Sequence, residues 1–315
     1  MKSYNELLII TGGLGHIGSS LFQSSGSNER LIIINDNLMA ERYCSSFGYH
    51  GKKNIKFVFG DIRDKNILNS IKKYSTDKIE SSKINIVHLA AMTDAASSFE
   101  KSDTLKENNL NGTCAALELA NDIGANFIFP SSTSVYGDNS DIVDENSILY
   151  PQSPYAESKI LEEEYVAKYH RSVILRLGTI VGPSQGMRFH TAVNSFIWKA
   201  ITGQKIQIWK TAYNQKRPYL CLDDFVRFIY HILDKEFFDA KVFNILSENS
   251  TPKKITDIIR KIIPNTQIEF VDSKIMNQLS YEVSTSLVES KGFHFNKTIE
   301  ESIIKTIEFL ENYEK

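Results

Sequence analysis

Short, continuous apolar runs that end in small or polar residues constrain the fold of this chain more than any other sequence feature. Six runs of four to six residues alternate with segments of helical spacing. They are Leu7–Ile10, Leu31–Ile34, Lys56–Phe59, Ile84–Leu89, Asn126–Phe129 and Val173–Leu177. Parallel strands that are buried on both faces produce such runs, and the helical crossovers between them are almost always right-handed. The sequence therefore predicts an α/β fold, a Rossmann-like doubly wound parallel sheet.

A glycine-rich turn follows the first run directly and opens a helix, with the sequence Thr11-Gly12-Gly13-Leu14-Gly15-His16-Ile17-Gly18. Glycines permit the tight turn and let a pyrophosphate approach the backbone at the helix N-terminus. Asp36 follows the second run, where a carboxylate can accept hydrogen bonds from both adenosine ribose hydroxyls and repels a 2′-phosphate. No basic residue stands at positions 35–38. The pattern predicts a dinucleotide cofactor, NAD in preference to NADP.

The character of the chain changes near residue 178, after which glycine and proline surround a predicted helix at 191–202. We expect an NAD-binding Rossmann domain over residues 1–178 and a smaller α/β domain, mainly for substrate, over residues 179–315. Segments near 220–246 are expected to pack back on the first domain. The later elements that the spacing predicts are helices at 224–233, 256–263 and 299–313 and a strand at 242–246.

Composition and charge argue against several classes of protein. The 315 residues carry 36 Lys and Arg against 38 Asp and Glu, so no broad basic field is available for nucleic acid. The 3 cysteines show no paired spacing, and no two histidines lie three or four residues apart, which argues against disulfides and metal sites. No apolar run approaches the ~18 residues of a membrane helix, and the first run is too short for a signal peptide. We expect a cytoplasmic protein without a metal.

A second pattern, Tyr155-Ala156-Glu157-Ser158-Lys159, places a phenol and an ammonium on one face of a helix predicted at 155–169. A tyrosine ordinarily titrates near pH ~10, but a neighbouring ammonium and an oxidised nicotinamide ring both favour the phenolate. Tyr155 is therefore a candidate general base for a sugar hydroxyl. Alone, this pattern is usually a solvated helix face. It gains specificity here from the preceding glycine-rich turn and from the run that ends in Ser131-Ser132.

With these motifs the sequence resembles the extended short-chain dehydrogenase/reductase family, in particular its NAD-dependent sugar-nucleotide epimerases and dehydratases. The resemblance covers nearly the whole chain. It is carried by TGGLGHIG at 11–18, DN at 36–37, GDIRD at 60–64, HLAA at 88–91, NNLNGT at 108–113, SSTSVYG at 131–137, SPYAESK at 153–159, LRLGTIVGP at 175–183 and RPYLCLDD at 217–224.

The resemblance implies a catalytic set, a cofactor site and a substrate site. The catalytic set is Ser132, Tyr155 and Lys159. The NAD contacts are Gly12, Gly15, His16, Ile17, Gly18, Asp36, Asn37, Asp61, Ile62, Leu89, Ala90, Ala91, Asn109, Ser131, Tyr155 and Lys159. The candidate substrate contacts are Thr93, Ser132, Thr179, Arg188, His190, Trp209 and Arg217.

Arg217 matches an arginine that grips a diphosphate, a task that suits a forked cation. Trp209 falls where an aromatic ring lies against the nucleotide base, although it can equally be a structural aromatic under a loop. His190 stands at a helix start, where a histidine is more often a solvated or capping residue. Thr179 replaces the asparagine that is usual in the family at this position.

Two departures bear on the reaction. The family's 4,6-dehydratases carry an Asp-Glu pair directly after the catalytic hydroxyl residue, whereas this chain has Thr133 and Ser134. Neither can serve as a carboxylate acid or base, so dehydration is not expected.

We expect 4-epimerisation of a nucleotide-diphosphate sugar through a 4-keto intermediate. The alternatives are a 4-dehydrogenase or 4-keto reductase that does not epimerise and a non-catalytic NAD-binding regulatory protein. The departures in the substrate domain favour an unusual cell-surface sugar over UDP-galactose. The composition, rich in Lys, Ile and Asn, favours a surface-polysaccharide pathway.

A homodimer is expected as well. In the family, helices that match residues 105–122 and 155–169 pair with their copies across an interface. Both helices carry more apolar residues than one sheet-facing stripe requires. These residues are Ala115, Leu117, Leu119, Ile160, Leu161 and Val166.

Overall fold

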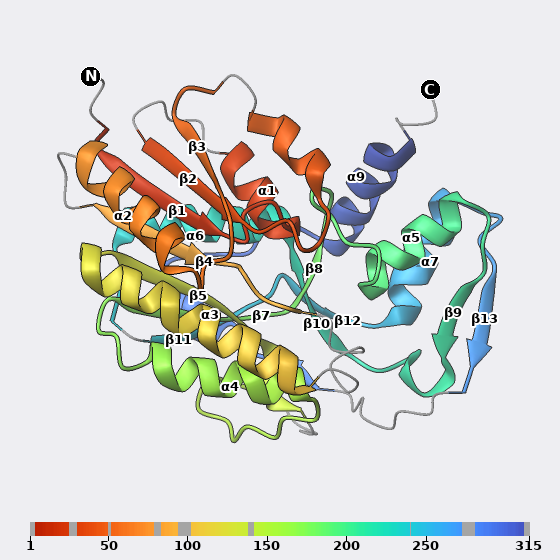
Figure 1. The fold of residues 1–315 in the computed structure, drawn as a ribbon. Helices are drawn as coiled ribbons and strands as arrows, with labels where there is room; N and C mark the ends of the chain where they lie inside the picture. Colours follow the sequence, from red (N-terminus) through yellow and green to blue (C-terminus); the bar gives the residue numbers. More distant parts are fainter. Residues whose placement is uncertain are drawn as a thin grey trace.

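The computed structural model describes residues 4–24, 30–49, 52–78, 83–93, 102–137, 142–239, 241–272 and 281–311. At its centre is a seven-stranded sheet in the order β11-β7-β5-β4-β1-β2-β3, with every neighbouring pair parallel (Figure 1). The strands are β1 (Glu6–Thr11), β2 (Arg30–Asp36), β3 (Ile55–Phe59), β4 (Ile84–His88), β5 (Asn126–Ser132), β7 (Ser172–Leu177) and β11 (Lys241–Ile245). The six apolar runs form six of these strands, so the predicted Rossmann-like fold is confirmed.

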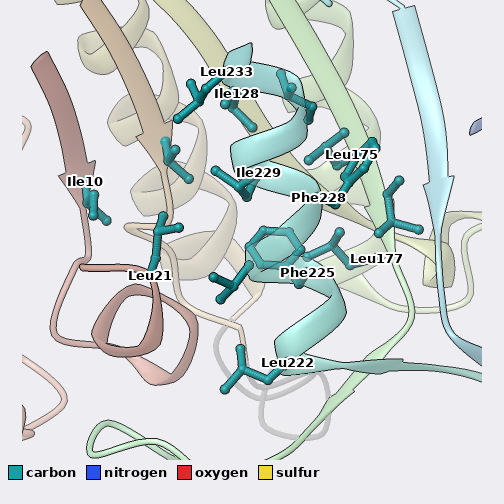
Figure 2. Packing of buried hydrophobic residues seen from close by; sticks show 14 of the residues in the cluster. Ile10, Leu21, Ile128, Leu175, Leu177, Leu222, Phe225, Phe228, Ile229 and Leu233 are labelled. Carbon is teal, nitrogen blue, oxygen red and sulfur yellow. The ribbon is translucent and has the colours of Figure 1, made fainter. Parts of the chain in front are cut away.

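Helices cover both faces of this sheet. They are α1 (His16–Gln23), α2 (Lys65–Lys78), α3 (Ser102–Ile123), α4 (Pro154–Val166) and α6 (Leu222–Lys235). Alternate residues of a strand point to opposite faces. Leu8 and Ile10 of β1 therefore join the core beneath α1 and α6, where Phe225 lies against the sheet (Figure 2). Leu7 and Ile9 join the core beneath α2, α3 and α4.

The chain after β7 builds a second, smaller region with a core of its own. Its strands pair as β12-β10-β8 and β13-β9, and β14 pairs with β6. In Figure 1, β9 and β13 lie beside α5 and α7, apart from the main sheet. The elements outside the main sheet and its helices are β6 (Ile142–Val143), β8 (Thr179–Val181), α5 (Ala192–Ile201), β9 (Ile206–Trp209), β10 (Arg217–Cys221), β12 (Glu248–Ser250), α7 (Pro252–Ile262), β13 (Ile268–Val271), β14 (Glu282–Val283), α8 (Ser286–Ser290) and α9 (Ile299–Glu311). Of these, β6 precedes β7 in the chain, and α8 packs through Val288 into the core beneath α1 and α6. Within the residues described, none of the helices combines the length and the apolar character that crossing a membrane requires.

Two helices begin at capping sequences that set their bounds. The Ser153 side chain accepts a hydrogen bond from the N–H of Ala156, and Pro154 follows as the first residue of α4. Thr251 and Pro252 form the same arrangement at the start of α7, which therefore begins four residues before the predicted position. In contrast, α4 ends at residue 166 instead of the predicted 169, because the chain turns there toward β7.

Helices α3 and α4, to which the sequence assigned an interface, lie side by side (Figure 1). Leu119 and Val166 are buried in the core of the chain itself, and Leu117 packs partly against that core. These residues are therefore not a surplus apolar surface, contrary to the expectation. The large apolar side chains that remain exposed on α4 are Leu161 at 40% and Tyr165 at 44%. The homodimer stays a prediction from the family resemblance.

Candidate active site

The candidate residues gather along the carboxyl edge of the parallel sheet. In the order of the strands, Asp36 ends β2, Gly12 follows β1, Ala90 follows β4 and Ser132 ends β5. The neighbours β1 and β4 are distant in sequence, and the winding of the sheet reverses between them. Open α/β sheets bind ligands in the crevice at such a switch point.

The turn between β1 and α1 has room for a ligand but none for side chains. Gly12 has a φ of +63°, and a Cβ there would lie 2.6 Å from the backbone N of Ala90. A Cβ on Gly18 would lie 2.5 Å from the carbonyl oxygen of Gly13. Gly15 is the N-cap of α1 and offers no side-chain cap, so the first N–H groups of the helix can bind an anion. This arrangement fits the diphosphate of a dinucleotide.

A cavity of about 330 Å³ opens beside this turn. Most residues predicted to contact NAD line it: Gly12, Gly15, His16, Ile17, Gly18, Asp36, Asn37, Asp61, Ile62, Leu89, Ala90 and Ala91. Asn109, Ser131, Tyr155 and Lys159 are not among its lining residues.

Two carboxylates line the end of the cavity at β2 and β3. Asp36 accepts hydrogen bonds from the backbone N–H of Leu14 at 3.0 Å and of Leu38 at 2.8 Å. A carboxylate has about four acceptor sites, so its oxygens can still accept from ribose hydroxyls. Hydrogen bonds from the Arg63 guanidinium lower the pKa of Asp61 to about 2, which keeps that carboxylate ionised at neutral pH.

A loop from the second region closes over the glycine-rich turn. The Nε2 of His16 donates to the carbonyl oxygen of Gly182 at 2.8 Å, because a carbonyl can only accept. Ser184 Oγ donates to the His16 carbonyl at 2.8 Å, and the N–H of Gly186 donates to Ser19 Oγ at 3.0 Å. The loop and the turn therefore form one wall of the cavity.

Thr93, Arg188 and His190, which the sequence analysis assigned to the substrate, line this same cavity. Arg188 Nη1 donates a hydrogen bond to Thr93 Oγ1 and so joins the loop to the segment that follows β4. These three residues therefore lie beside the predicted cofactor residues. Sequence reasoning could not place them there, because the contact joins positions 95 residues apart.

Arg42 also lines the cavity, and the sequence analysis missed it. Burial lowers the pKa of its guanidinium to about 10, and the charge of Arg188 acts in the same direction. Burial likewise lowers the pKa of His16 to about 4, and both arginines contribute to that shift. Two guanidinium groups that repel each other beside an uncapped helix N-terminus favour an anionic ligand. The only sequence signal for Arg42 was its position six residues after Asp36.

The catalytic candidates lie where β5 ends and α4 begins. Ser132 is the N-cap of the short helix η3 (Thr133–Tyr136), and its Oγ accepts a hydrogen bond from the N–H of Ser134 at 3.2 Å. Lys159 Nζ lies 6.0 Å from the centre of the Tyr155 ring, and the Lys159 side chain is only 3% exposed. Because η3 packs against α4, these candidates share one end of the sheet.

Two residues of η3 carry aliphatic hydroxyl groups, Thr133 and Ser134. Thr133 Oγ1 donates to the carbonyl oxygen of Leu177 at 3.1 Å. Ser134 Oγ is buried, with no hydrogen-bond partner in the part of the chain described. The two positions after Ser132 thus hold hydroxyl side chains and no carboxylate.

Two predicted cofactor residues hold neighbouring parts of the site. Asn109 clamps the backbone of Met92, accepting from its N–H at 2.8 Å and donating to its carbonyl at 3.0 Å. Ser131 Oγ donates to Glu163, which is paired with Arg176 at 2.7 Å. These contacts fix the chain after β4 and the end of β5.

The remaining substrate candidates lie in the second region, outside the cavity lining. Thr179 is exposed at the start of β8, and Trp209 is half-buried at the end of β9. The Arg217 guanidinium lies 5.4 Å from the centre of the Tyr281 ring, and its Nη2 is buried without a hydrogen-bond partner among the described residues. Tyr281, which the sequence analysis missed, donates to the carbonyl of Thr133 at 3.2 Å. No local sequence signal predicted this link.

Comparison with known proteins places the chain in a family. The model of the NAD-dependent epimerase/dehydratase family matches residues 8–245. The chain belongs to this family. It is therefore a member of an NAD-dependent enzyme family, and the predicted cofactor, NAD, is confirmed.

Curated relatives and solved structures agree with this assignment. The chain is 34% identical over 284 residues to a dTDP-D-glucose 4,6-dehydratase of Dictyostelium discoideum, covering 80% of this chain and 62% of that protein. It is 28% identical over 333 residues to a dTDP-D-glucose 4,6-dehydratase of Bos taurus, covering 99% of this chain and 90% of that protein. The UDP-glucose 4-epimerase of Thermotoga maritima has a similar fold, with a TM-score of 0.86 at 23% identity, over 98% of this chain and 100% of that one.

Proposed function

We propose that this family member catalyses oxidation and reduction at C4 of a nucleotide-diphosphate sugar and that its net reaction is 4-epimerisation. The observation that carries the proposal is the placement of Ser132 at the end of β5, before a turn that has no carboxylate, with Tyr155 and Lys159 on the helix that packs against that turn. This set supplies what removal of the C4 hydroxyl proton requires, and nothing that elimination of water requires.

The cofactor is proposed to lie along the cavity from Asp36 to Ala90. Asp36 accepts from the adenosine ribose hydroxyls, and the N-terminus of α1 faces the diphosphate. Arg42 and Arg188 line the same cavity and add positive charge beside that helix end. When bound there, NAD supplies an acceptor, and later a donor, for the C4 hydride.

The chain's own residues manage the proton and the developing charge on oxygen. Tyr155 takes the proton of the C4 hydroxyl, and the ammonium of Lys159 favours the phenolate form that can do so. Ser132 donates a hydrogen bond to the same substrate oxygen. Arg217, with a buried nitrogen free of partners among the described residues, is the proposed clamp for the substrate diphosphate.

Dehydration, the activity in the names of the two curated relatives above, is not favoured. It requires an acid for the C6 hydroxyl and a base for the C5 proton. The hydroxyl of Thr133 is already donated to a carbonyl, and neither Thr133 nor Ser134 can act as a carboxylate. Thr179, which is exposed at the start of β8, replaces the longer asparagine that is usual in the family. We assign to this replacement the space that a 4-keto sugar needs to turn and present its other face.

A substrate deuterated at C4 separates the candidate reactions. The substrates to test are a panel of UDP-, dTDP- and GDP-sugars. The expected result with one of them is that deuterium returns to C4 with inverted configuration. Deuterium that stays on the cofactor, with release of a 4-keto sugar, would instead assign the 4-dehydrogenase. A product that has lost one water would assign a dehydratase, and the absence of any transfer would assign a non-catalytic NAD-binding protein. Tyr155→Phe should slow hydride transfer by about 10²–10⁴-fold.

A further inference from the structure

A fully buried carboxylate lies next to the candidate catalytic lysine. The side chain of Glu162, one turn after Lys159 on α4, is 0% exposed. Its Oε2 lies 3.2 Å from Lys159 Nζ and accepts a hydrogen bond from Thr113 Oγ1 of α3 at 2.7 Å. Its Oε1 accepts from Ser158 Oγ at 3.0 Å. Three donors thus hold this carboxylate in place.

The ammonium of Lys159 is held between this carboxylate and two aromatic rings. Its Nζ lies 4.6 Å from the centre of the Phe129 ring and 6.0 Å from the centre of the Tyr155 ring. Buried ion pairs cost desolvation energy and are weak evidence for a purely stabilising role. We therefore ask what the Glu162 carboxylate does to the chemistry of Lys159 and Tyr155.

The other titratable groups around this pair are neutral or already paired. Burial and the charge of Lys159 lower the pKa of His88 on β4 to about 3. Burial raises the pKa of Cys114 on α3, and it raises that of Tyr136 on η3 to about 12. On the β7 side, Arg176 is paired with Glu163. Near the start of α4, Glu157 is paired with Lys106 of α3. Lys159 and Glu162 are paired with each other, and the ammonium of this pair lies 6.0 Å from the centre of the Tyr155 ring.

We propose that Glu162 is a positioning residue that fixes the Lys159 ammonium and offsets part of its positive field at Tyr155. The proposal rests on the proposed function, in which Tyr155 is the general base. In this arrangement the carboxylate holds the ammonium beside the phenol and limits how strongly that ammonium favours the phenolate.

The expected size of the effect follows from the distances. The Glu162 carboxylate oxygen lies 3.2 Å from an ammonium that is itself 6.0 Å from the centre of the Tyr155 ring. A negative charge about 9–12 Å from the phenol oxygen, at an effective dielectric constant of about 20, disfavours the phenolate by about one pH unit. Glu162→Gln keeps the shape of the side chain and one accepting oxygen, replaces the other oxygen by a donating NH2 group that can pair with the Ser158 hydroxyl oxygen, and removes the charge. The phenolate should then form at a pH about one unit lower than in the wild type.

The test follows the Tyr155 phenol directly in the NAD-loaded protein, with tyrosine labelled with ¹³C at Cζ and the signal assigned by its loss in Tyr155→Phe. A titration midpoint about one unit lower in Glu162→Gln supports the proposal. An unchanged or higher midpoint overturns it. Thr113→Val keeps the charge but removes one donor from the oxygen nearest Lys159, so it should move the midpoint upward. A downward shift in Thr113→Val would contradict the proposal even if Glu162→Gln did not fold.

Glu163→Gln is the matched control, because it removes the adjacent buried carboxylate, which pairs with Arg176 instead of Lys159. It should lower stability and, because the Lys159–Glu162 pair stays intact, shift the Tyr155 midpoint less than Glu162→Gln does. The titration needs no substrate, so it separates the two proposals. If the midpoint shifts but the pH dependence of hydride transfer does not follow it, Tyr155 is not the base and the proposed function fails while the role of Glu162 stands.

Discussion

Gly186 is the position where one added methyl group should loosen the cofactor cavity without touching a ligand-contacting side chain. An alanine Cβ there would meet the carbonyl oxygens of Leu14 and Gly15 at 2.4 and 2.5 Å. Both contacts are with backbone atoms, which cannot rotate away as a side chain can. The loop must therefore move off the glycine-rich turn.

The cost can be worked from the contacts that would be strained or lost. Overpacking of this kind costs about 1–3 kcal/mol. The hydrogen bond from the Gly186 N–H to Ser19 Oγ contributes about 1 kcal/mol more when it is broken. We expect Gly186→Ala to lower the free energy of unfolding by about 2–4 kcal/mol. Because the displaced carbonyls belong to the turn that is proposed to face the diphosphate, NAD binding should weaken by about tenfold or more.

Urea denaturation and calorimetric NAD titration measure the two effects. Gly203→Ala is the control, since its φ is +69° and nothing lies within 4 Å of the added Cβ. That variant should lose only about 1–2 kcal/mol from the left-handed backbone and keep the NAD affinity of the wild type. Wild-type NAD affinity in Gly186→Ala would refute the argument that the loop supports the turn.

Three further predictions follow from the cavity and the helix surface. Asp36→Ala should weaken NAD binding and reduce the preference of the protein for NAD over NADP. Tighter binding of NADP than of NAD by the wild type would contradict the role of Asp36. The pKa of His16 is lowered from 6.5 to about 4 in the folded protein. Between these pH values the unfolded state binds a proton that the folded state does not, so the free energy of unfolding should decrease as the pH is lowered from 6.5 toward 4. His16→Gln should remove about 2 kcal/mol of this loss between neutral pH and pH ~5, as measured by urea denaturation at both pH values. If a homodimer forms through α4, Leu161→Glu should shift sedimentation equilibrium toward monomer, and a wild-type monomer at micromolar concentration would exclude that interface.

Local sequence patterns were sufficient for most of the sheet and for the cofactor side of the site. An apolar run such as Leu7–Ile10 can be satisfied only by burial on both faces, so its strand was predictable without knowledge of the partners. The glycine-rich turn and Asp36 were predictable for a related reason, because the proposed cofactor site is built largely from strands, a turn and a helix that are close in sequence. Helix bounds were less secure at α4, whose end depends on where the chain must turn toward β7.

Contacts between distant segments were decided only by the tertiary structure. Arg188 and His190 were predicted to contact the substrate because they precede a helix of the second region. In the structure, the hydrogen bond between His16 and the Gly182 carbonyl places their loop beside the proposed cofactor cavity. The sequence analysis assigned no role to Glu162, and only the packing of α3 against α4 buries it beside Lys159. Sequence spacing determines which residues share one strand, turn or helix face. Which faces meet depends on the burial of apolar surface summed over the whole chain, and that sum has no local signature.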